Sequence, residues 1–389
     1  RDARSSLVGS EMCIRDRAYL DLVARRCPEL REVEVPACVS DTITLSTMHG
    51  CPPDEIEQIS LYLIEERKLH TSVKCNPTLL GPDRVRGIIN DDLGFSDVPV
   101  PDEAFGHDLK YVDAVPMFHN LRRAAAAQGV QFGLKLSNTL EVENWRTRFE
   151  GDGMMYLSGR ALHPVTANLA AKLTEEFRGN LMLSYAGGAD CFNVTDLLSA
   201  GMTTVTVCSD LLKTGGYLRL PQYVEHLDAA LETAGAEDLP DLAARRAIEG
   251  EGFEEFVPLL RWSAMTDSTL ALDEADCASI AGALRAADEP AADAVRAWAA
   301  ERELGEERAA VLVGLVGRVC ARLNLRHYAS DVRTDWRYQK ASFRTDRSKT
   351  SRELGLFDCI EAPCVDECPV DQNVPLYTVS YTHLRAHET

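Results

Sequence analysis

Three cysteines lie close together near the C-terminal end of the chain, in the segment CIEAPCVDECPVDQNVP. Cys359, Cys364 and Cys368 are spaced as C-x4-C-x3-C, and a proline follows the last of them. Thiolates grouped on one tight loop can converge on iron, so this pattern is typical of iron–sulfur cluster binding. Structural zinc sites favour cysteine pairs with a second pair further along, and none follows here. We therefore predict a 4Fe-4S cluster with a fourth ligand from elsewhere, and keep zinc or free thiols as alternatives.

Small residues follow two predicted strands, residues 181–186 and 203–208, in a pattern that suits phosphate binding. Backbone N–H groups at two adjacent strand ends can cradle one phosphate, and the last two strands of a βα barrel usually supply such a site. An earlier loop, at residues 158–162, would contribute to the same phosphate site. The alternative is that the glycine pair in the first loop only permits a tight turn. The residues that we expect at a phosphate site are Ser158, Gly159, Gly187, Gly188, Cys208 and Ser209.

Polar side chains also stand at the ends of two earlier predicted strands. Lys74 lies in the strand at residues 71–75, and Asn138 follows the strand at residues 131–137. Side chains at such positions point into the mouth of a barrel, where they can hydrogen-bond a ring system. Most lysines are surface residues, but Lys74 belongs to an otherwise apolar strand. The same rim is expected to include Lys135, His49 and Cys51, the last two with the alternative of a helix-initiating turn around a buried thiol.

The elements that would position these residues follow a βα pattern from residue 18 to residue 220. Short β-rich runs alternate with amphipathic stretches, as in βα units around a parallel sheet. Prolines 52 and 53, followed by two acidic residues, predict the start of one helix, and residues 165–177 predict another. Periodicity alone does not choose between an open doubly wound sheet and part of a barrel. The predicted strands are residues 41–47, 71–75, 131–137, 181–186 and 203–208.

Residues 221–330 are rich in Ala, Leu and Glu and predict a helical spacer. We expect breaks near Pro240, Pro258 and Pro290, because proline ends or begins helices. Cys277 and Cys320 fall in apolar stripes and are expected to be inert core residues. The stretch at residues 327–352 is basic and aromatic. We interpret it as a connector that lies on an acidic neighbour, with a nucleic-acid patch as the alternative.

The composition limits the function classes. The chain has 389 residues, with 41 Lys and Arg against 61 Asp and Glu, which gives a formal net charge of -20. Such a charge disfavours nucleic acid and anionic membranes as partners. No apolar run has the roughly 18 residues that a spanning helix needs. Twelve cysteines without a secretory signal favour a cytoplasmic protein with free thiols or metal ligands.

Both ends of the chain are expected to be non-native. Residues 1–17 and 379–389 show no periodicity continuous with their neighbours. The stretches SSLVGSEMCIRD and VSYTHLRAHET resemble translated sequencing-adapter DNA, and such segments are left out of fold reasoning. The alternative is that they are native termini.

Five motifs occur in a fixed order along the chain: TSVKCNPTLLG, LSNTLEV, YLSGRALHPVTANLA, SYAGGAD and TTVTVCSDLL. In this order they resemble the FMN-binding motifs of dihydroorotate dehydrogenase-type barrels, most of all those of dihydropyrimidine dehydrogenase. The cysteine segment is similar to the iron–sulfur N-terminal region shared by dihydropyrimidine dehydrogenase and the glutamate synthase small subunit. A barrel followed by a helical spacer and this region resembles the selenate reductase flavoprotein subunits of bacteria.

This resemblance implies an α/β fold: a partial (βα)8 TIM barrel at residues 18–220, comprising its last five βα units. The spacer at residues 221–330 would lead to the start of an α-helical ferredoxin-like domain at residues 331–378. The resemblance also implies that Lys74 contacts the isoalloxazine ring of FMN and that Asn138 faces the ring or the substrate. The phosphate side would be lined by Ser158, Gly159, Gly187, Gly188, Cys208 and Ser209.

The chain departs from the family pattern where the catalytic residues are expected. The family has an asparagine and a proton-donating cysteine in the motif NLSCP, and this chain has Thr44 and Thr47 at those places. A threonine hydroxyl is too weak an acid to replace a thiol easily. Cys51, four residues after Thr47, is the other candidate proton donor. Leu356 occupies the place of a further family cysteine.

The resemblance implies an iron–sulfur flavoprotein oxidoreductase subunit that passes electrons between flavin and 4Fe-4S clusters. Its partners would be other redox subunits or domains and a small-molecule substrate, with no nucleic acid and no membrane span. FAD and NAD(P)H would bind only in a further C-terminal part. The alternatives are a non-catalytic barrel scaffold in an electron-transfer complex and a ring reductase similar to dihydropyrimidine dehydrogenase.

Overall fold

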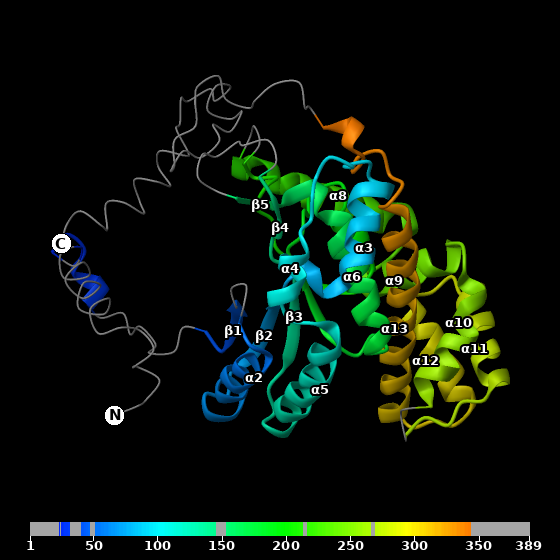
Figure 1. Ribbon diagram of the computed structural model, residues 1–389. Coiled ribbons are helices and arrows are strands. Elements are labelled where there is room, and N and C mark those ends of the chain that lie inside the picture. The colour runs from blue at the N-terminus through cyan, green and yellow to red at the C-terminus, as the bar shows by residue number, and fades with distance from the viewer. Residues whose placement is uncertain are drawn as a thin grey trace.

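A five-stranded parallel sheet forms the first part of the protein. The computed structural model describes Val23 and residues 25–31, 40–46, 51–144, 153–212, 216–265 and 269–343. The strand order is β1-β2-β3-β6-β7, and every neighbouring pair is parallel. All five predicted strands are confirmed, because each coincides with one strand of this sheet (Figure 1). The strands are β1 (Thr42–Ser46), β2 (His70–Cys75), β3 (Phe132–Leu136), β6 (Met182–Tyr185) and β7 (Met202–Val205).

The two faces of the sheet differ in polarity, because successive side chains of a strand point to opposite faces. On one face Val73, Leu134 and Leu183 are buried, with exposed fractions of 0%, 0% and 3%. On the other face Lys74 and Lys135 lie side by side in register and are only half-buried. Helices therefore cover the apolar face, while the polar face forms the inner surface of the curved sheet.

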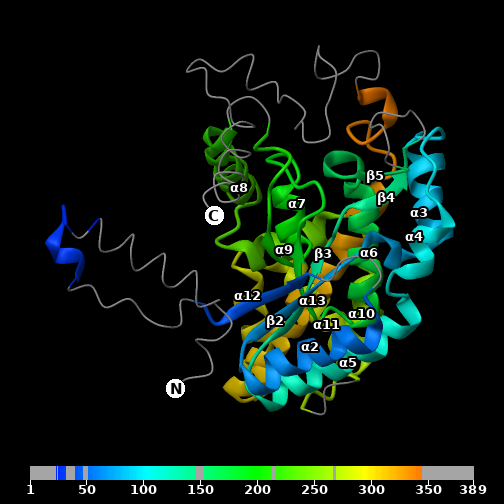
Figure 2. The same cartoon turned by 60° about the vertical axis from the view of Figure 1, so that its left-hand side comes forward.

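The covering helices follow the strands as in βα units. α5 and α6 both pack on β3, α7 packs on β7, and α2 packs on α5. Figure 2 shows α2 and α5 together beside β2 and β3. The predicted helices after residue 52 and at residues 165–177 are thus confirmed. The bounds are α2 (Pro53–Leu61), α3 (Pro82–Arg86), α4 (Asp102–His107), α5 (Tyr111–Ala127), α6 (His163–Glu176) and α7 (Val194–Ser199).

A small antiparallel hairpin interrupts the βα alternation, and the sequence analysis missed it. β4 (Leu140–Glu143) pairs with β5 (Met154–Leu157), outside the main sheet. Leu140 and Val142 are buried, whereas Glu143 is exposed, so β4 has the alternation of a half-buried strand. Strands of four residues carry too little periodicity to be distinguished from loops.

Among the described residues after the sheet, six helices, α8 to α13, lie where the sequence predicts a helical spacer. Residues of α9 to α13 enclose a second apolar core, which contains Phe256, Ile280 and Leu312. Cys277 and Cys320 are fully buried there, and burial raises the pKa of their thiols to about 11 and about 12, as expected of inert core residues. The bounds are α8 (Leu220–Ala234), α9 (Leu239–Glu249), α10 (Phe256–Ala264), α11 (Glu274–Ala286), α12 (Ala291–Glu301) and α13 (Glu306–Asp331).

α13 joins the two parts of the protein. It packs on α6 of the sheet layer and also on α9, α10 and α12 (Figure 1). Leu323 belongs to the helical core, whereas Leu325 belongs to the core of the sheet. Arg322 is buried between the two and donates hydrogen bonds to Ser263 at 3.0 Å and to Glu175 of α6 at 2.8 Å.

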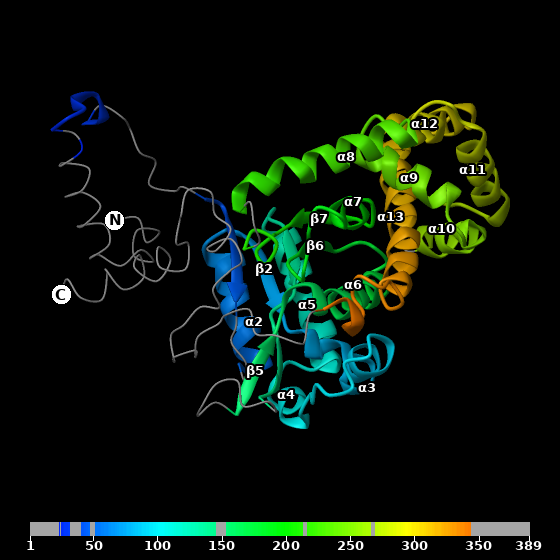
Figure 3. The same ribbon diagram turned by 90° about the horizontal axis from the view of Figure 1, so that it is seen from above.

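The segment that follows α13, residues 332–343, returns to the sheet and is called the C-terminal connector below. Arg333 pairs with Asp92 at 2.5 Å, and Lys340 pairs with Asp97. A third pair joins Arg337 to Asp190 at 2.8 Å. For residues 332–343, these three pairs confirm the prediction of a basic connector that lies on an acidic neighbour. Seen from above, the connector lies beside α6 and the segment around α3 (Figure 3).

Several predictions fall outside the described residues. Thr47 and His49 belong to this group, as do both predicted non-native segments and the cysteine motif with most of the predicted ferredoxin-like domain. The cluster ligands Cys359, Cys364 and Cys368 therefore stay predictions. Among the helices that the structure describes, none combines the length and apolarity required to cross a bilayer.

Changing Arg322 to Met tests the joint between the two cores. It removes a buried guanidinium and leaves the partly buried Glu175 with Arg326 as its remaining partner. We expect the free energy of unfolding to fall by about 1–3 kcal/mol, because Glu175 and the buried Ser263 each lose a hydrogen bond from the buried guanidinium. The measurement is urea unfolding. Arg296→Gln, which breaks an exposed pair with Asp293, should cost less than about 1 kcal/mol. Equal losses in the two variants would contradict the bridging role of Arg322.

Candidate functional site

A polar layer crosses the inner face of the sheet near the carboxyl ends of its strands. Ser46, Lys74, Lys135 and Ser184 pair in register across β1, β2, β3 and β6. Thr204 of β7 extends the layer, because its hydroxyl donates to the Ser184 hydroxyl at 2.7 Å. The register of β1, β2, β3 and β6, together with a register shift between β6 and β7 that sets Thr204 opposite Ser184, therefore delivers two ammonium groups and three hydroxyls to a single surface. This surface can hydrogen-bond a flat polar ligand.

The two lysines of this layer create a local positive potential in an acidic protein. Burial, together with the charge of Lys135, lowers the pKa of Lys74 below its ordinary value. Like charges on neighbouring strands repel each other, and an electron-rich ligand between them relieves that repulsion. Both lysines belong to the barrel rim that the sequence predicts, and the register of β2 and β3 sets them side by side.

Two asparagines fix the loops that follow β2 and β3. The Asn138 side-chain amide donates to the Asn76 side-chain oxygen at 2.6 Å. The Asn138 backbone N–H donates to the Cys75 carbonyl at 2.9 Å. Asn138 is thus held at the carboxyl end of the sheet, beside the strand that carries Lys74.

Three predicted phosphate loops converge into one structure, which we call the glycine cradle: residues 158–160, 187–188 and 208–209. A Cβ atom on Gly188 would lie 2.3 Å from the Gly159 carbonyl oxygen, and one on Gly159 would lie 3.0 Å from the Ser209 hydroxyl. A Cβ atom on Gly187 would lie 2.3 Å from the Thr166 hydroxyl of α6. Glycine is therefore required by close packing between the loops and against α6, and not only by a tight turn.

The cradle offers hydrogen-bond donors to an anion. Within the described part of the chain, the backbone N–H groups of Gly187, Gly188 and Ser209 donate to no other backbone or side-chain group. Buried or clustered N–H groups are normally paired, so unpaired ones at converging loops are suited to phosphate oxygens. Cys208 lies in the same loop as Ser209 and is exposed.

The carboxylates close to the cradle are already neutralised. Asp190 accepts two hydrogen bonds from Arg337, at 3.0 and 2.8 Å. Asp210 accepts from Arg219 and, at 2.7 Å, from the Tyr223 hydroxyl. An anionic ligand would therefore meet little repulsion from these two buried acids.

A buried polar cluster beneath the cradle was not found from the sequence. His163 Nδ1 lies 3.0 Å from the Gly187 carbonyl oxygen and 2.9 Å from the Tyr185 hydroxyl, while Nε2 lies 2.6 Å from the Tyr328 hydroxyl. Burial lowers the pKa of His163 to about 4, so the ring is neutral. With the proton on Nδ1, His163 donates to Gly187 and accepts from Tyr328. The available signal was a histidine immediately after the LSGRAL motif.

The proton-donor candidates are only partly described. Cys51 is half-buried in the loop between β1 and α2. Burial, Glu55 and Asp54 raise the pKa of its thiol, so Cys51 stays protonated and can give up a proton. Thr44 is exposed on the inner face, in register with Ser72 of β2. Thr47 lies outside the described residues.

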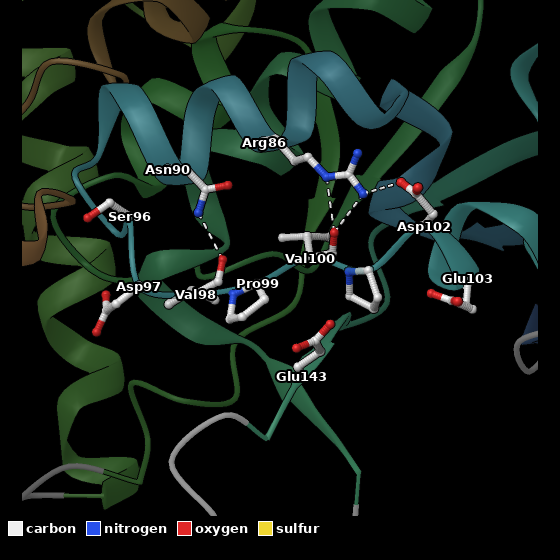
Figure 4. Close-up of a pocket in the computed structure, with 11 residues that line it drawn as sticks. Arg86, Asn90, Ser96, Asp97, Val98, Pro99, Val100, Asp102, Glu103 and Glu143 are labelled. Atoms are coloured by element: carbon white, nitrogen blue, oxygen red, sulfur yellow. Dashed lines mark hydrogen bonds and ion pairs between the residues drawn. The ribbon is translucent and has the colours of Figure 1, made fainter.

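A separate groove lies elsewhere on the protein. A groove of about 640 Å³ runs between α3 and β4, and its lining shares no residue with the polar layer or the cradle (Figure 4). Arg86 crosses it, donating to the Val100 carbonyl and pairing with Asp102 at 2.5 Å. Within residues that the structure describes, no three His, Cys, Asp or Glu side chains gather to hold a metal ion.

Comparison with known proteins relates the chain to one oxidoreductase group. The family model described as "Oxidoreductase YgfK, N-terminal TIM-barrel domain" matches residues 15–249. The candidate oxidoreductase YgfK of Escherichia coli strain K12 is 44% identical over 214 residues, which are 54% of this chain and 20% of that protein. The YgfK protein of Escherichia coli O157:H7 gives the same values. The chain thus spans about a fifth of the length of the curated relatives it matches.

A solved structure, dihydroorotate dehydrogenase (DHODH) from Eimeria tenella in complex with ferulenol, is also similar to part of the chain. The two sequences are 16% identical, and the match covers 49% of this chain and 57% of that one. The TM-score is 0.29, below the level at which two folds are counted as the same.

Changing Gly188 to Ala tests the close packing of the cradle. Gly188 has φ +76°, and its added Cβ would meet the backbone of Gly159. We expect the free energy of unfolding to fall by about 2–4 kcal/mol, because a left-handed backbone conformation and overpacking add. Gly235→Ala is the matched control, since Gly235 has φ +60° with open space around it, and should cost about 1 kcal/mol. Chemical denaturation of both variants measures the difference, and equal losses would contradict the cradle contact.

Proposed function

Because this chain belongs to the YgfK oxidoreductase family, with residues 15–249 matching its N-terminal TIM-barrel domain, we propose that it forms the FMN-binding part of an iron–sulfur flavoprotein. Its five βα units would be the last five of the barrel. The FMN ring would lie on the polar layer of the inner face, and the FMN phosphate would lie in the glycine cradle.

The observation that carries this proposal is the placement of the cradle and the polar layer at one edge of one sheet. The loops after β5, β6 and β7 converge at Gly159, Gly188 and Ser209. Lys74 and Lys135 are in register on strands of the same sheet. FMN has a phosphate at one end and an electron-rich ring at the other. Unpaired N–H groups suit the first, and ammonium groups suit the second.

When bound, FMN supplies reversible transfer of one or two electrons. The residues of the chain have supporting tasks. The N–H groups of Gly187, Gly188 and Ser209 hold the phosphate, and Lys74 and Lys135 favour negative charge on the reduced ring. Asn138, fixed by Asn76, orients the ring or a substrate above it.

The cluster part of the proposal rests on sequence alone. Cys359, Cys364 and Cys368 would supply three ligands of a 4Fe-4S cluster, which would exchange electrons with the flavin. The physiological partners would be further redox subunits or domains, with FAD and NAD(P)H bound in a part of the protein beyond this chain. Selenate reductase-like chemistry with a small-molecule acceptor fits this arrangement.

Cys51 supports a second candidate function, reduction of a pyrimidine ring. Cys51 precedes α2 and packs against the core of the sheet, and burial with the nearby Glu55 and Asp54 raises the pKa of its thiol, which keeps it protonated. A protonated thiol can complete a ring reduction by giving a proton to the carbon next to the one that receives hydride.

The FMN proposal is tested with Lys74→Ala. The complete protein is purified anaerobically, and its flavin is released by acid and identified. We expect FMN in the wild type and a loss of affinity of about tenfold to a hundredfold in Lys74→Ala, since a charge-assisted hydrogen bond is removed. Lys110→Ala, at an exposed position before α5, serves as the control and should bind FMN normally. A wild type without FMN would mean that the barrel is a scaffold, and unchanged affinity in Lys74→Ala would remove Lys74 from the site.

The ring-reductase alternative is tested with Cys51→Ser. A serine hydroxyl is a much weaker acid, so we expect a fall in rate of about 10²- to 10⁴-fold if Cys51 is the proton donor. The measurement is the rate at which uracil reoxidises the dithionite-reduced protein under anaerobic conditions. Cys277→Ser, at a buried thiol of the helical core, controls for general effects of the substitution. A rate equal to that of the wild type would rule out Cys51 as the donor.

A further inference from the structure

We propose that the C-terminal connector, residues 332–343, forms part of the glycine cradle, so that the occupancy of the cradle and the order of the connector are coupled. This inference rests on the proposed function, since the occupant is the FMN phosphate. It assigns to residues outside the βα units a role in positioning the phosphate loops.

The first contact joins the connector to the Gly187–Gly188 loop through His163. The Tyr338 ring of the connector stacks on the His163 ring, with centroids 4.9 Å apart and an interplanar angle of 14°. His163 in turn hydrogen-bonds the Gly187 carbonyl. Tyr338 has an exposed fraction of 1%, and it belongs to the core of the sheet. One buried aromatic pair therefore connects the connector to the loop backbone.

A second contact reaches the same loop through Asn193, the residue before α7. Its side-chain amide donates to the Gly188 carbonyl and to the Tyr338 hydroxyl, both at 3.2 Å. The Asn193 side-chain oxygen accepts from the Asp190 backbone N–H at 2.8 Å. Asp190 is bound by Arg337, the neighbour of Tyr338. Two adjacent connector residues thus hold both ends of the segment 188–193.

The third contact holds the other wall of the cradle. The Arg160 guanidinium lies over the Phe343 ring, 4.3 Å from its centroid, and within 3.5 Å of the Ser342 carbonyl oxygen. Phe343 also packs edge-on against Phe95, with centroids 5.4 Å apart. The Gly159–Arg160 loop is therefore fixed by the last described residues of the connector.

Coupling through these contacts acts in both directions, because thermodynamic linkage is reciprocal. A ligand that orders the cradle loops must also stabilise the connector that packs on them, and a loosened connector must weaken the ligand by the same factor. The connector is anchored independently to Asp92 and Asp97, so it remains in place when one contact is removed.

The test combines amide hydrogen exchange with FMN titration of the complete protein. Tyr338→Phe removes the hydroxyl that accepts from Asn193 and hydrogen-bonds Tyr328, and it keeps the ring that stacks on His163. Tyr62→Phe is the matched control, since the Tyr62 hydroxyl accepts from Arg67 at an exposed position on another element. Exchange is followed at residues 187–193 and 333–343, with and without FMN. Affinity is measured by quenching of flavin fluorescence.

We expect FMN to slow exchange at residues 333–343 by about fivefold or more in the wild type. Tyr338→Phe should raise the Kd for FMN by about tenfold and speed exchange at residues 187–193, with a thermal midpoint close to that of Tyr62→Phe. Protection of residues 187–193 by FMN without any change at residues 333–343 would overturn the inference, as would wild-type affinity in Tyr338→Phe.

The experiment also distinguishes failure of the FMN site from failure of the connector's role. A wild type that binds no FMN would disprove the FMN site, and the exchange of the ligand-free protein then decides the connector's role. Faster exchange at residues 187–193 in Tyr338→Phe than in Tyr62→Phe would still support the connector as part of the cradle. Equal exchange in the two variants would overturn it.

Discussion

The structure of the candidate site depends on the parallel pairing of five strands, of which β1, β2, β3 and β6 share one register. Parallel pairing brings the carboxyl ends of all strands to one edge of the sheet, so the loops that follow them are neighbours although they are far apart in sequence. The register from Ser46 through Lys74 and Lys135 to Ser184 fixes which side chains share the inner face. A shift of one residue in any strand would turn its polar side chains toward the helices and remove them from the site.

Glycine at the cradle follows from the same geometry. The loop after β6 is packed between α6 and the loop that follows the β4–β5 hairpin, and at Gly187 and Gly188 there is no room for a side chain. The backbone N–H groups then become the main polar groups on this surface. A neutral histidine, His163, supports the loop from below, which adds no charge that would compete for an anion.

Charge in this acidic chain is organised by pairs between distant segments. The buried acids Asp190 and Asp210 are paired with Arg337 and Arg219, and Glu175 is paired with two arginines of α13. Burial raises the pKa of Glu175, but the hydrogen bonds from Arg326 and Arg322 outweigh that effect, and the pKa is lowered. Through such pairs the helical region and the connector pack firmly on the βα units, and the boundaries predicted between them do not mark a break in packing.

The sequence alone determined the five strands, the helices α2 and α6, the helical spacer and the glycine-rich loops. Each depends on local signals: β-rich runs, proline and acidic residues at helix starts, and small residues after strands. The basic connector and the inert cysteines Cys277 and Cys320 were also predictable, because charge and apolar stripes are visible in one dimension. The FMN site and the cluster ligands Cys359, Cys364 and Cys368 remain predictions from sequence patterns.

Only the tertiary structure decided the rest. The β4–β5 hairpin depends on pairing between two four-residue strands that carry almost no periodic signal. His163 lies in a cluster with Tyr185, Tyr328 and Tyr338. The last two are far from His163 in the sequence but in contact with it in the fold. A buried polar side chain is stable only when its partners are in place, and those partners are set by packing and not by neighbouring residues in the chain.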